Sequence, residues 1–398
     1  MEEFLTKRVA CLYASQTQAM KLKSQDLKDQ GIDVINLTAG ESDFFMPDHV
    51  KEAAIDAVNQ NFSFYSPGDG YMELRKAVAA KLKNENNLDF LPQQIIITNG
   101  AKHALANSMM ALVDDGDEVI VPAPYWVTYV ELVKLTGGTN VIIQTSVEND
   151  FKMTPAQLEA AITPKTKALI LCSPLNPTGS VYSKEELKAI ADIVAKHRRI
   201  FIISDEIYEK INYVGKHETI AQFENVREQT VVINGVSKGY AMTGYRIGYL
   251  AAPLWITKAC SKMQGHFTSG ASSISQRAAL KALTSDNTFC EEMCKRFKIR
   301  RDLMVQGLSE IPDLKYNIPQ GAFYLFPDVS AYFGKSDGET VINTSTDMSL
   351  YLLGKAHVGT VPGDAFGDPK GVRISYAAAD EDLKKALAKM KSAFAKLN

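Results

Sequence analysis

Short runs of β-branched and aliphatic residues recur through the middle of the chain, and they predict buried strands. Each run is apolar almost without interruption, which is typical of a strand covered on both faces of its sheet. Helical patterns separate most of the runs, so we expect an α/β fold in which a mostly parallel seven-stranded sheet lies between two layers of helices. The seven runs occupy residues 94–98, 118–121, 140–145, 168–172, 200–204, 230–234 and 246–251.

Two helices in this region carry start signals that can be read directly. Thr154 and Gln157 have the spacing of a capping box, with Pro155 at the first helical position. Ser183 and Glu186 repeat that spacing ahead of a helix expected to reach about residue 197.

The two ends of the chain show a different pattern. Residues 1–47 predict one helix and a short extended stretch at 34–38, and a long charged helix follows residue 285. Three strands are then expected in the segments GAFYLFP, HVGTV and GVRISY, before a terminal helix with one apolar face. A length of 398 residues suits two or three domains. We therefore predict a large domain over 48–285 and a small discontinuous α+β domain built from 1–47 and 286–398.

Composition narrows the class of protein. Lys and Arg number 44 against 46 Asp and Glu, a net charge of −2, which argues against nucleic acid or an anionic membrane as the main partner. No apolar run approaches the ~18 residues of a membrane helix, and the N-terminus lacks an apolar signal core. The five cysteines form no C-x-x-C pair, which suits reduced, buried thiols and a cytoplasmic protein without a metal site.

Chemically distinctive residues follow the predicted strands. In an open parallel sheet, ligands bind beyond the carboxyl ends of the strands, so these segments should converge on one site. They contain a helix start with glycine, an indole, an amide, an acid with a phenol, and a lysine. The segments are Asn99-Gly100-Ala101-Lys102, Tyr125-Trp126, Asn176-Pro177-Thr178-Gly179, Asp205-Glu206-Ile207-Tyr208 and Ser237-Lys238.

This set of residues favours pyridoxal phosphate over a nucleotide. Gly68-Asp69-Gly70 fails the dinucleotide pattern because Glu73 replaces the third glycine, and no phosphate-binding G-x-x-x-x-G-K-[ST] occurs. Pyridoxal phosphate needs a lysine for a Schiff base and a carboxylate for its pyridine nitrogen. Its phosphate needs N–H donors, which a helix N-terminus supplies.

The segment from Gly235 to Gly248 (GVSKGYAMTGYRIG) resembles the lysine signature of the class I/II aminotransferases. The Asn176-Pro177-Thr178-Gly179 and Ser204-to-Tyr208 segments match two further hallmarks of that family, and the similarity runs over essentially the whole chain. Within the family, the chain is most similar to bacterial aspartate aminotransferases of the Ib subgroup. The resemblance implies a fold-type-I transferase dependent on pyridoxal phosphate, and a homodimer with shared active sites.

The resemblance also implies a role for each site residue. Lys238 would be the catalytic lysine, Asp205 would pair with the pyridine nitrogen, Tyr208 and Asn176 would contact the ring oxygen, and Trp126 would stack on the ring. The phosphate would be held by the backbone of Gly100, Ala101 and Lys102, by Ser237 and Arg246, and by Tyr65 from the partner subunit. Arg373 would clamp the substrate α-carboxylate beside Gly40, because its planar guanidinium suits a carboxylate.

Substrate choice would depend on a second cation. Lys102, with Ser15 and Thr17, would meet the side-chain carboxylate of a dicarboxylic amino acid, which favours aspartate with 2-oxoglutarate among amino and 2-oxo acids. Prephenate, aromatic or alanine transamination is the alternative within the same fold. A regulator that senses pyridoxal phosphate is disfavoured, because the family pattern fills residues 1–398.

Taken singly, these residues have simpler interpretations. Lys238 could be a solvated lysine, Asp205 a helix N-cap, Trp126 a core residue, Tyr65 a packing residue and Lys102 a surface cation.

Overall fold

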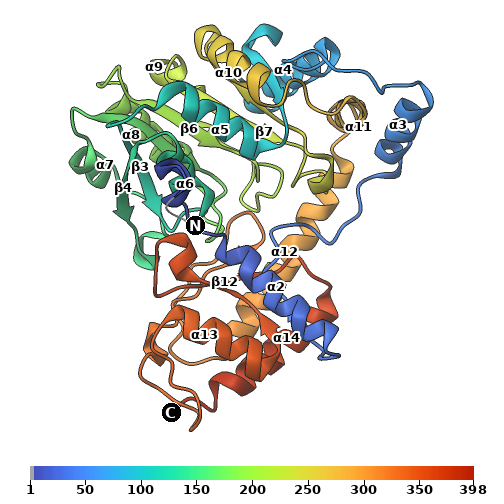
Figure 1. Ribbon diagram of the computed structural model, residues 1–398. Coiled ribbons are helices and arrows are strands. Elements are labelled where there is room, and N and C mark those ends of the chain that lie inside the picture. The colour runs from blue at the N-terminus through green and yellow to red at the C-terminus, as the bar shows by residue number, and fades with distance from the viewer. Residues whose placement is uncertain (1–3) are drawn as a thin grey trace.

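The computed structural model describes residues 4–398, and its centre is the predicted sheet (Figure 1). Seven strands pair in the order β2-β8-β7-β6-β5-β3-β4. The neighbours β7-β6, β6-β5, β5-β3 and β3-β4 are parallel, whereas β8 runs antiparallel to both β7 and β2. The strands span Ile95–Thr98 (β2), Glu118–Ala123 (β3), Thr139–Gln144 (β4), Thr166–Cys172 (β5), Phe201–Asp205 (β6), Thr230–Gly235 (β7) and Gly248–Ala251 (β8).

Helices cover both faces of this sheet because alternate strand residues point to opposite sides. Ile96 packs into one apolar cluster, with helices α5 (Ala101–Leu112), α6 (Thr128–Leu135) and α10 (Leu254–Phe267). Ile95 and Ile97 pack into another, with α3 (Asp48–Asn59), α4 (Met72–Asn86) and α11 (Ser273–Thr284). On that second side, a third cluster joins the sheet to α7 (Pro155–Ala161) and α8 (Lys184–Val194), near the short α9 (Glu224–Arg227). The expected three layers are therefore confirmed.

Both predicted capping boxes are present. Thr154 caps α7 and Ser183 caps α8, each through a reciprocal bond with the residue three positions later. Helix α8 ends at Val194, three residues earlier than expected, and the backbone continues in turns to residue 199.

The two ends of the chain pack together below the sheet, where α2 (Gln16–Asp29), α13 (Ser345–Tyr351) and α14 (Asp380–Phe394) lie close to one another (Figure 1). Strand β1 (Ile35–Asn36) pairs in parallel with β10 (Val358–Gly359), so the two termini share a ladder. Strands β11 (Val361–Pro362), β12 (Val372–Ser375) and β9 (Tyr324–Leu325) form an antiparallel sheet. The exact division into two domains stays a prediction, because this core also includes Ile207 and Ile211 from the loop after β6.

A long helix, α12 (Thr288–Leu308), connects the two parts. Cys290 near its start belongs to the sheet-side core, whereas Phe297 and Met304 belong to the lower core. The Cys290 thiol also donates a 2.9 Å hydrogen bond to the Gly239 carbonyl, beside the predicted catalytic lysine.

The cysteines are free, but the expectation that all are buried is wrong. Cys11 is exposed, next to the short α1 (Lys7–Ala10), and Cys294 is half-buried. Among residues 4–398, no helix is both long enough and apolar enough to cross a membrane.

Candidate active site

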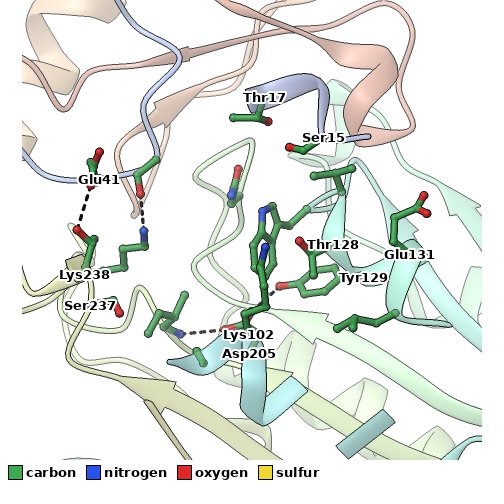
Figure 2. A pocket seen from close by; sticks show the side chains of 18 of the residues that line it. Ser15, Thr17, Glu41, Lys102, Thr128, Tyr129, Glu131, Asp205, Ser237 and Lys238 are labelled. Atoms are coloured by element: carbon green, nitrogen blue, oxygen red, sulfur yellow. Dashed lines mark hydrogen bonds between the residues drawn. The ribbon is translucent and has the colours of Figure 1, made fainter. Parts of the chain in front are cut away.

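A cavity of about 670 Å³ opens at the carboxyl edge of the sheet, where the residues after β3, β5, β6 and β7 converge (Figure 2). Most of the predicted site residues line it, and they come from the sheet edge and from both ends of the chain. Two do not line it: Gly100 lies behind it as the N-cap of α5, and Tyr65 is 98% exposed elsewhere on the surface. The predicted lining residues are Ser15, Thr17, Gly40, Ala101, Lys102, Trp126, Asn176, Asp205, Tyr208, Ser237, Lys238, Arg246 and Arg373.

Lys238 lies in the loop after β7 and points across the cavity, where its ammonium donates to the Gly40 carbonyl (Figure 2). Burial lowers the pKa of Lys238 to about 8, with Glu41 opposing the shift and Arg246 and Arg373 adding to it. At pH 7 roughly a tenth of the amine is then neutral, compared with less than a thousandth for an ordinary lysine. A lysine tuned in this way can act as a nucleophile and as a base.

Asp205 occupies the last position of β6 and is 2% exposed. Its Oδ2 accepts a 2.7 Å bond from the Tyr129 hydroxyl, and its Oδ1 accepts a 3.2 Å bond from the Ile207 N–H. Burial raises the pKa of Asp205 to about 6, against the lowering effect of these two donors. The residues that follow form a turn, so Asp205 caps a turn and not a helix.

Arg373, on β12, is also 2% exposed and is held on several sides. One Nη donates to the Thr38 carbonyl at 2.8 Å and the other to Asn176 Oδ1 at 3.1 Å. Its guanidinium carbon lies 4.6 Å from the centre of the Tyr324 ring. The Nε atom has no hydrogen-bond partner among the described residues, and burial lowers the pKa of this arginine. A buried guanidinium with a free donor fits the carboxylate of a bound amino acid.

Two tyrosines and a glycine shape the wall between these groups. The hydroxyls of Tyr208 and Tyr324 lie 2.8 Å apart, so one donates to the other. A β carbon on Gly40 would come within 3.2 Å of the Tyr324 hydroxyl. A side chain at this position would therefore crowd Tyr324, and the predicted contact of Gly40 with the substrate carboxylate stays a prediction.

The part of the cavity next to the N-terminus of α5 has the features of an anion site. Gly100 has φ +80° at the start of α5, and a β carbon there would collide with the Arg246 guanidinium. Arg246 is fixed by a 2.8 Å bond to the Thr243 carbonyl, and Ser237 is buried nearby. A helix N-terminus beside a cation is a ready site for phosphate.

The remaining predicted residues lie toward the rim. The Lys102 ammonium is 4.9 Å from the centre of the Trp126 ring, and partial burial together with Arg246 lowers the pKa of Lys102. Ser15 caps α2 by accepting a 3.4 Å bond from the Gln18 N–H, and Thr17 follows in its first turn. Figure 2 shows Ser15 and Thr17 together, on the side of the cavity away from Lys238.

A model of the family aminotransferase class I and II matches residues 32–390. The chain belongs to this family. A bifunctional aspartate aminotransferase and glutamate/aspartate-prephenate aminotransferase of Petunia hybrida is 46% identical over 394 residues, covering 98% of this chain and 82% of that protein. The solved aspartate aminotransferase of Rhizobium meliloti superposes with a TM-score of 0.96 at 40% identity, over 99% of both chains. That of Thermus thermophilus with maleate gives 0.92 at 40% identity, over 98% of this chain and 99% of that one.

This aminotransferase is an enzyme that depends on pyridoxal phosphate, and its cavity fits that cofactor. Asp205 offers a buried carboxylate for the pyridine nitrogen, and Lys238 offers an amine with a lowered pKa. The α5 N-terminus and Arg246 offer donors for the phosphate. The α/β fold predicted from the sequence is thereby confirmed, together with the family and the cofactor.

The sequence-based prediction missed several residues that line the cavity, above all Tyr129, Tyr324 and Glu41. Tyr129 follows Trp126 by three positions, a spacing that places both on one side of a helix start. That spacing alone gives no sign that the hydroxyl meets Asp205. Tyr324 belongs to a segment read correctly as a strand, but its contact with Tyr208 joins positions 116 residues apart.

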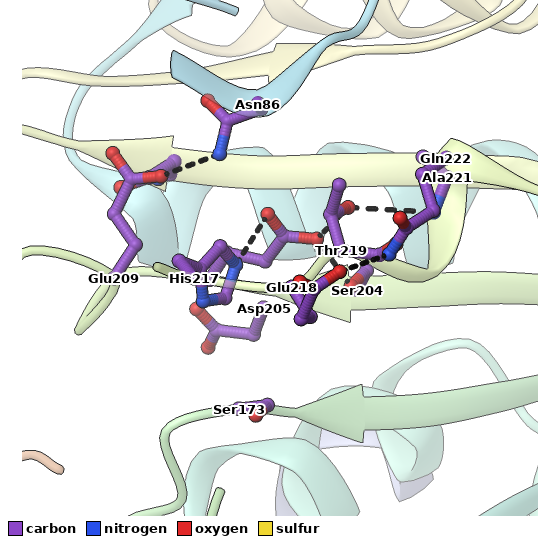
Figure 3. Close-up of polar contacts among 12 residues, drawn as sticks. Asn86, Ser173, Ser204, Asp205, Glu209, His217, Glu218, Thr219, Ala221 and Gln222 are labelled. Carbon is purple, nitrogen blue, oxygen red and sulfur yellow. Dashed lines mark hydrogen bonds and ion pairs between the residues drawn. The ribbon is translucent and has the colours of Figure 1, made fainter. Parts of the chain in front are cut away.

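A second buried polar cluster lies outside the cavity, around Glu206, Glu209 and His217 (Figure 3). Ligand atoms of the three lie within 4.8 Å of one another, a spacing that could suit a small cation. Both carboxylates already have partners, however: Glu206 accepts from Ser204 at 2.8 Å and lies 3.0 Å from the His217 Nε2 atom.

Glu209 forms an ion pair with Lys81 and accepts a 3.1 Å bond from Asn86. Burial would raise the pKa of Glu209, but Lys81, His217 and Lys210 lower it to about 2. The Lys81 ammonium thus supplies the positive charge that a metal would bring, and we assign no metal ligand here.

Proposed function

We propose that this aminotransferase moves the amino group of L-aspartate to 2-oxoglutarate, giving oxaloacetate and L-glutamate by ping-pong chemistry. The observation that carries the proposal is that the cavity holds two cations besides the catalytic Lys238 and the phosphate-side Arg246. Arg373 suits the α-carboxylate that every amino acid has, and Lys102 with Ser15 and Thr17 suits a second carboxylate. The Thermus thermophilus enzyme was solved with maleate, which is likewise a dicarboxylate.

The residues divide the chemistry among themselves. Bound pyridoxal phosphate supplies the electron sink that stabilises negative charge on the substrate α-carbon. Lys238 Nζ takes and returns the α-proton, for which a pKa of about 8 is well placed. Asp205 keeps a negative charge at the pyridine nitrogen, and Arg373 orients the substrate by its carboxylate.

Prephenate is the second candidate substrate. The relative from Petunia hybrida carries that activity in its name, and prephenate is also a dicarboxylate that two cations would suit. Aromatic amino acids and alanine lack the second carboxylate, so they would leave Lys102 without a partner.

We also propose a homodimer with shared active sites. Hydrogen bonds fix the loop that carries Tyr65: Ser273 donates to the Phe64 carbonyl at 2.7 Å, and Ser66 donates to the Ala271 carbonyl at 2.7 Å. The side chains of Phe64 and Tyr65 nevertheless remain 80% and 98% exposed. Fixed, exposed aromatic residues suit an interface, and Tyr65 would reach the phosphate in the partner subunit. The free cysteines favour a reducing compartment, and we propose the cytoplasm.

A panel of amino donors tests the substrate. Replacing Lys102 with Ala should lower kcat/KM for aspartate about tenfold or more, because a charge-assisted bond to the substrate is lost. The same change should alter the values for alanine and phenylalanine less than threefold.

Lys83→Ala, at an exposed lysine on α4, is the matched control and should change none of the values. Equal losses for all donors would remove Lys102 from side-chain recognition. Prephenate is a 2-oxo acid and so an amino acceptor; a wild-type preference for prephenate over 2-oxoglutarate, with aspartate as donor, would make prephenate the substrate.

A further inference from the structure

Tyr129 touches two of the groups assigned to the cofactor at once. It lies on α6 with 2% exposure, and its hydroxyl donates to Asp205 Oδ2 at 2.7 Å (Figure 2). Its ring also meets the Trp126 ring edge-on, with centroids 5.5 Å apart and an interplanar angle of 88°. One side chain therefore links an indole that follows β3 to a carboxylate that ends β6.

The contact with Asp205 fixes the orientation of the carboxylate. A carboxylate accepts about four hydrogen bonds, and here Tyr129 and the Ile207 N–H take one on each oxygen. With both oxygens held, the plane of the group is set, and the remaining lone pairs are available to a ligand in the cavity that Asp205 lines.

The hydroxyl of Tyr129 is also a dependable donor. Burial, followed by the nearby Asp205 and Cys172, raises the pKa of Tyr129 well above its ordinary value, so the phenol keeps its proton. A neutral donor stabilises the anionic form of Asp205, which burial and Glu206 disfavour and Lys238 favours.

We propose that Tyr129 is a positioning residue that holds the Asp205 carboxylate and the Trp126 ring in the orientation that the pyridine ring of the cofactor requires. This inference rests on the proposed function only in that the protein binds pyridoxal phosphate, and it holds for any amino donor. Tyr129 lines the cavity, but its hydroxyl proton is committed to Asp205, so we assign it no part in proton transfer.

The two tryptophans of the chain allow a direct test. Trp255 is 53% exposed and packs on Phe201, away from the cavity, so Trp255→Phe leaves Trp126 as the single fluorescent reporter in full-length protein. Release of pyridoxal phosphate is then followed as recovery of Trp126 emission. The control is Tyr332→Phe, which removes a buried hydroxyl that donates at 2.7 Å to the Pro312 carbonyl in the lower core.

Tyr129→Phe removes the hydroxyl but keeps the ring, and it should speed cofactor release about tenfold or more. Tyr332→Phe should lower the thermal unfolding midpoint about as much as Tyr129→Phe does. It should leave the rate of cofactor release within twofold of the parent. In an Asp205→Asn background, Tyr129→Phe should raise the rate of cofactor release by less than a further twofold, because the two residues act as one unit. Tyr129→Leu should in addition shift the Trp126 emission maximum of the cofactor-free protein.

The inference is overturned if Tyr129→Phe releases the cofactor as slowly as Tyr332→Phe, or if its effect is undiminished in the Asp205→Asn background. Either result would make Tyr129 a packing residue only. A parent protein that binds no pyridoxal phosphate would instead contradict the cofactor assignment, so the two failures are distinguishable.

Discussion

The two ends of the cavity differ in how firmly their side chains are held. Asp205 and Arg373 are each 2% exposed and each make two hydrogen bonds to the protein. At the rim, Lys102 is exposed, and Ser15 and Thr17, the N-cap and a first-turn residue of α2, are only half-buried and follow an exposed Tyr13. In the proposed reaction, the firmly held groups would meet the cofactor ring and the α-carboxylate that every amino acid shares, whereas the rim groups would meet the side chain that differs between substrates.

This contrast indicates which positions of the cavity tolerate substitution with the smallest loss of activity. A substitution among buried, hydrogen-bonded groups leaves polar atoms without partners, and such atoms are expensive to bury. A substitution at the rim leaves its neighbours in water. We therefore expect effects to fall in size from Lys238 to Arg373 and then to Thr17.

Replacing Lys238 with Ala should produce the largest effect. Turnover should fall by about a thousandfold or more with every donor, since both the covalent link and the group that moves the α-proton are lost. The visible absorption band of the lysine-bound cofactor should disappear, while circular dichroism shows an unchanged fold. Retention of a tenth of the wild-type turnover would contradict the assignment of Lys238.

Arg373→Lys should have an intermediate effect that is the same for all donors. A lysine keeps the charge but cannot form the paired bonds of the guanidinium, and kcat/KM should fall by roughly tenfold to a hundredfold, mainly through KM. Arg301→Lys, at a buried arginine outside the cavity, is the control and should change stability alone. A loss confined to aspartate would move Arg373 to side-chain recognition and weaken the contrast between the two ends.

The smallest effect is expected for Thr17→Val, which removes one hydroxyl at nearly constant volume. KM for aspartate should rise about threefold, the value of a single neutral hydrogen bond, and KM for alanine should not change. Steady-state kinetics with both donors measures this difference. A loss as large as that of Arg373→Lys would show that the rim is as critical as the buried end.

Much of the fold could be predicted because strands and helix starts are indicated by residues that are close together in the sequence. Three consecutive isoleucines at 95–97 predict a strand buried on both faces, and Ser183 with Glu186 predicts a helix start. The end of α8 was misplaced by three residues, because the residues after Val194 continue in turns that its pattern does not distinguish from helix.

The site was predictable where a residue lies at or just beyond the carboxyl end of a strand, as Asp205 and Lys238 do, or where it belongs to a family motif. Tyr129 and Tyr324 were missed because their roles depend on partners brought close only by the fold. The Tyr129–Asp205 bond spans 76 positions, and no periodicity in either segment encodes it. The burial of Asp205, which raises its pKa to about 6, is likewise a property of the whole sheet.

The bond between Arg373 and the Thr38 carbonyl spans 335 positions, and this has a consequence for biosynthesis. The ribosome makes the chain from its N-terminus, and structural units generally fold as they emerge. All seven strands of the large sheet precede Arg373 in the chain, so they are made while Thr38 still lacks its partner. The contact that fixes Arg373 for a substrate carboxylate therefore forms only after the last part of the sequence has been made.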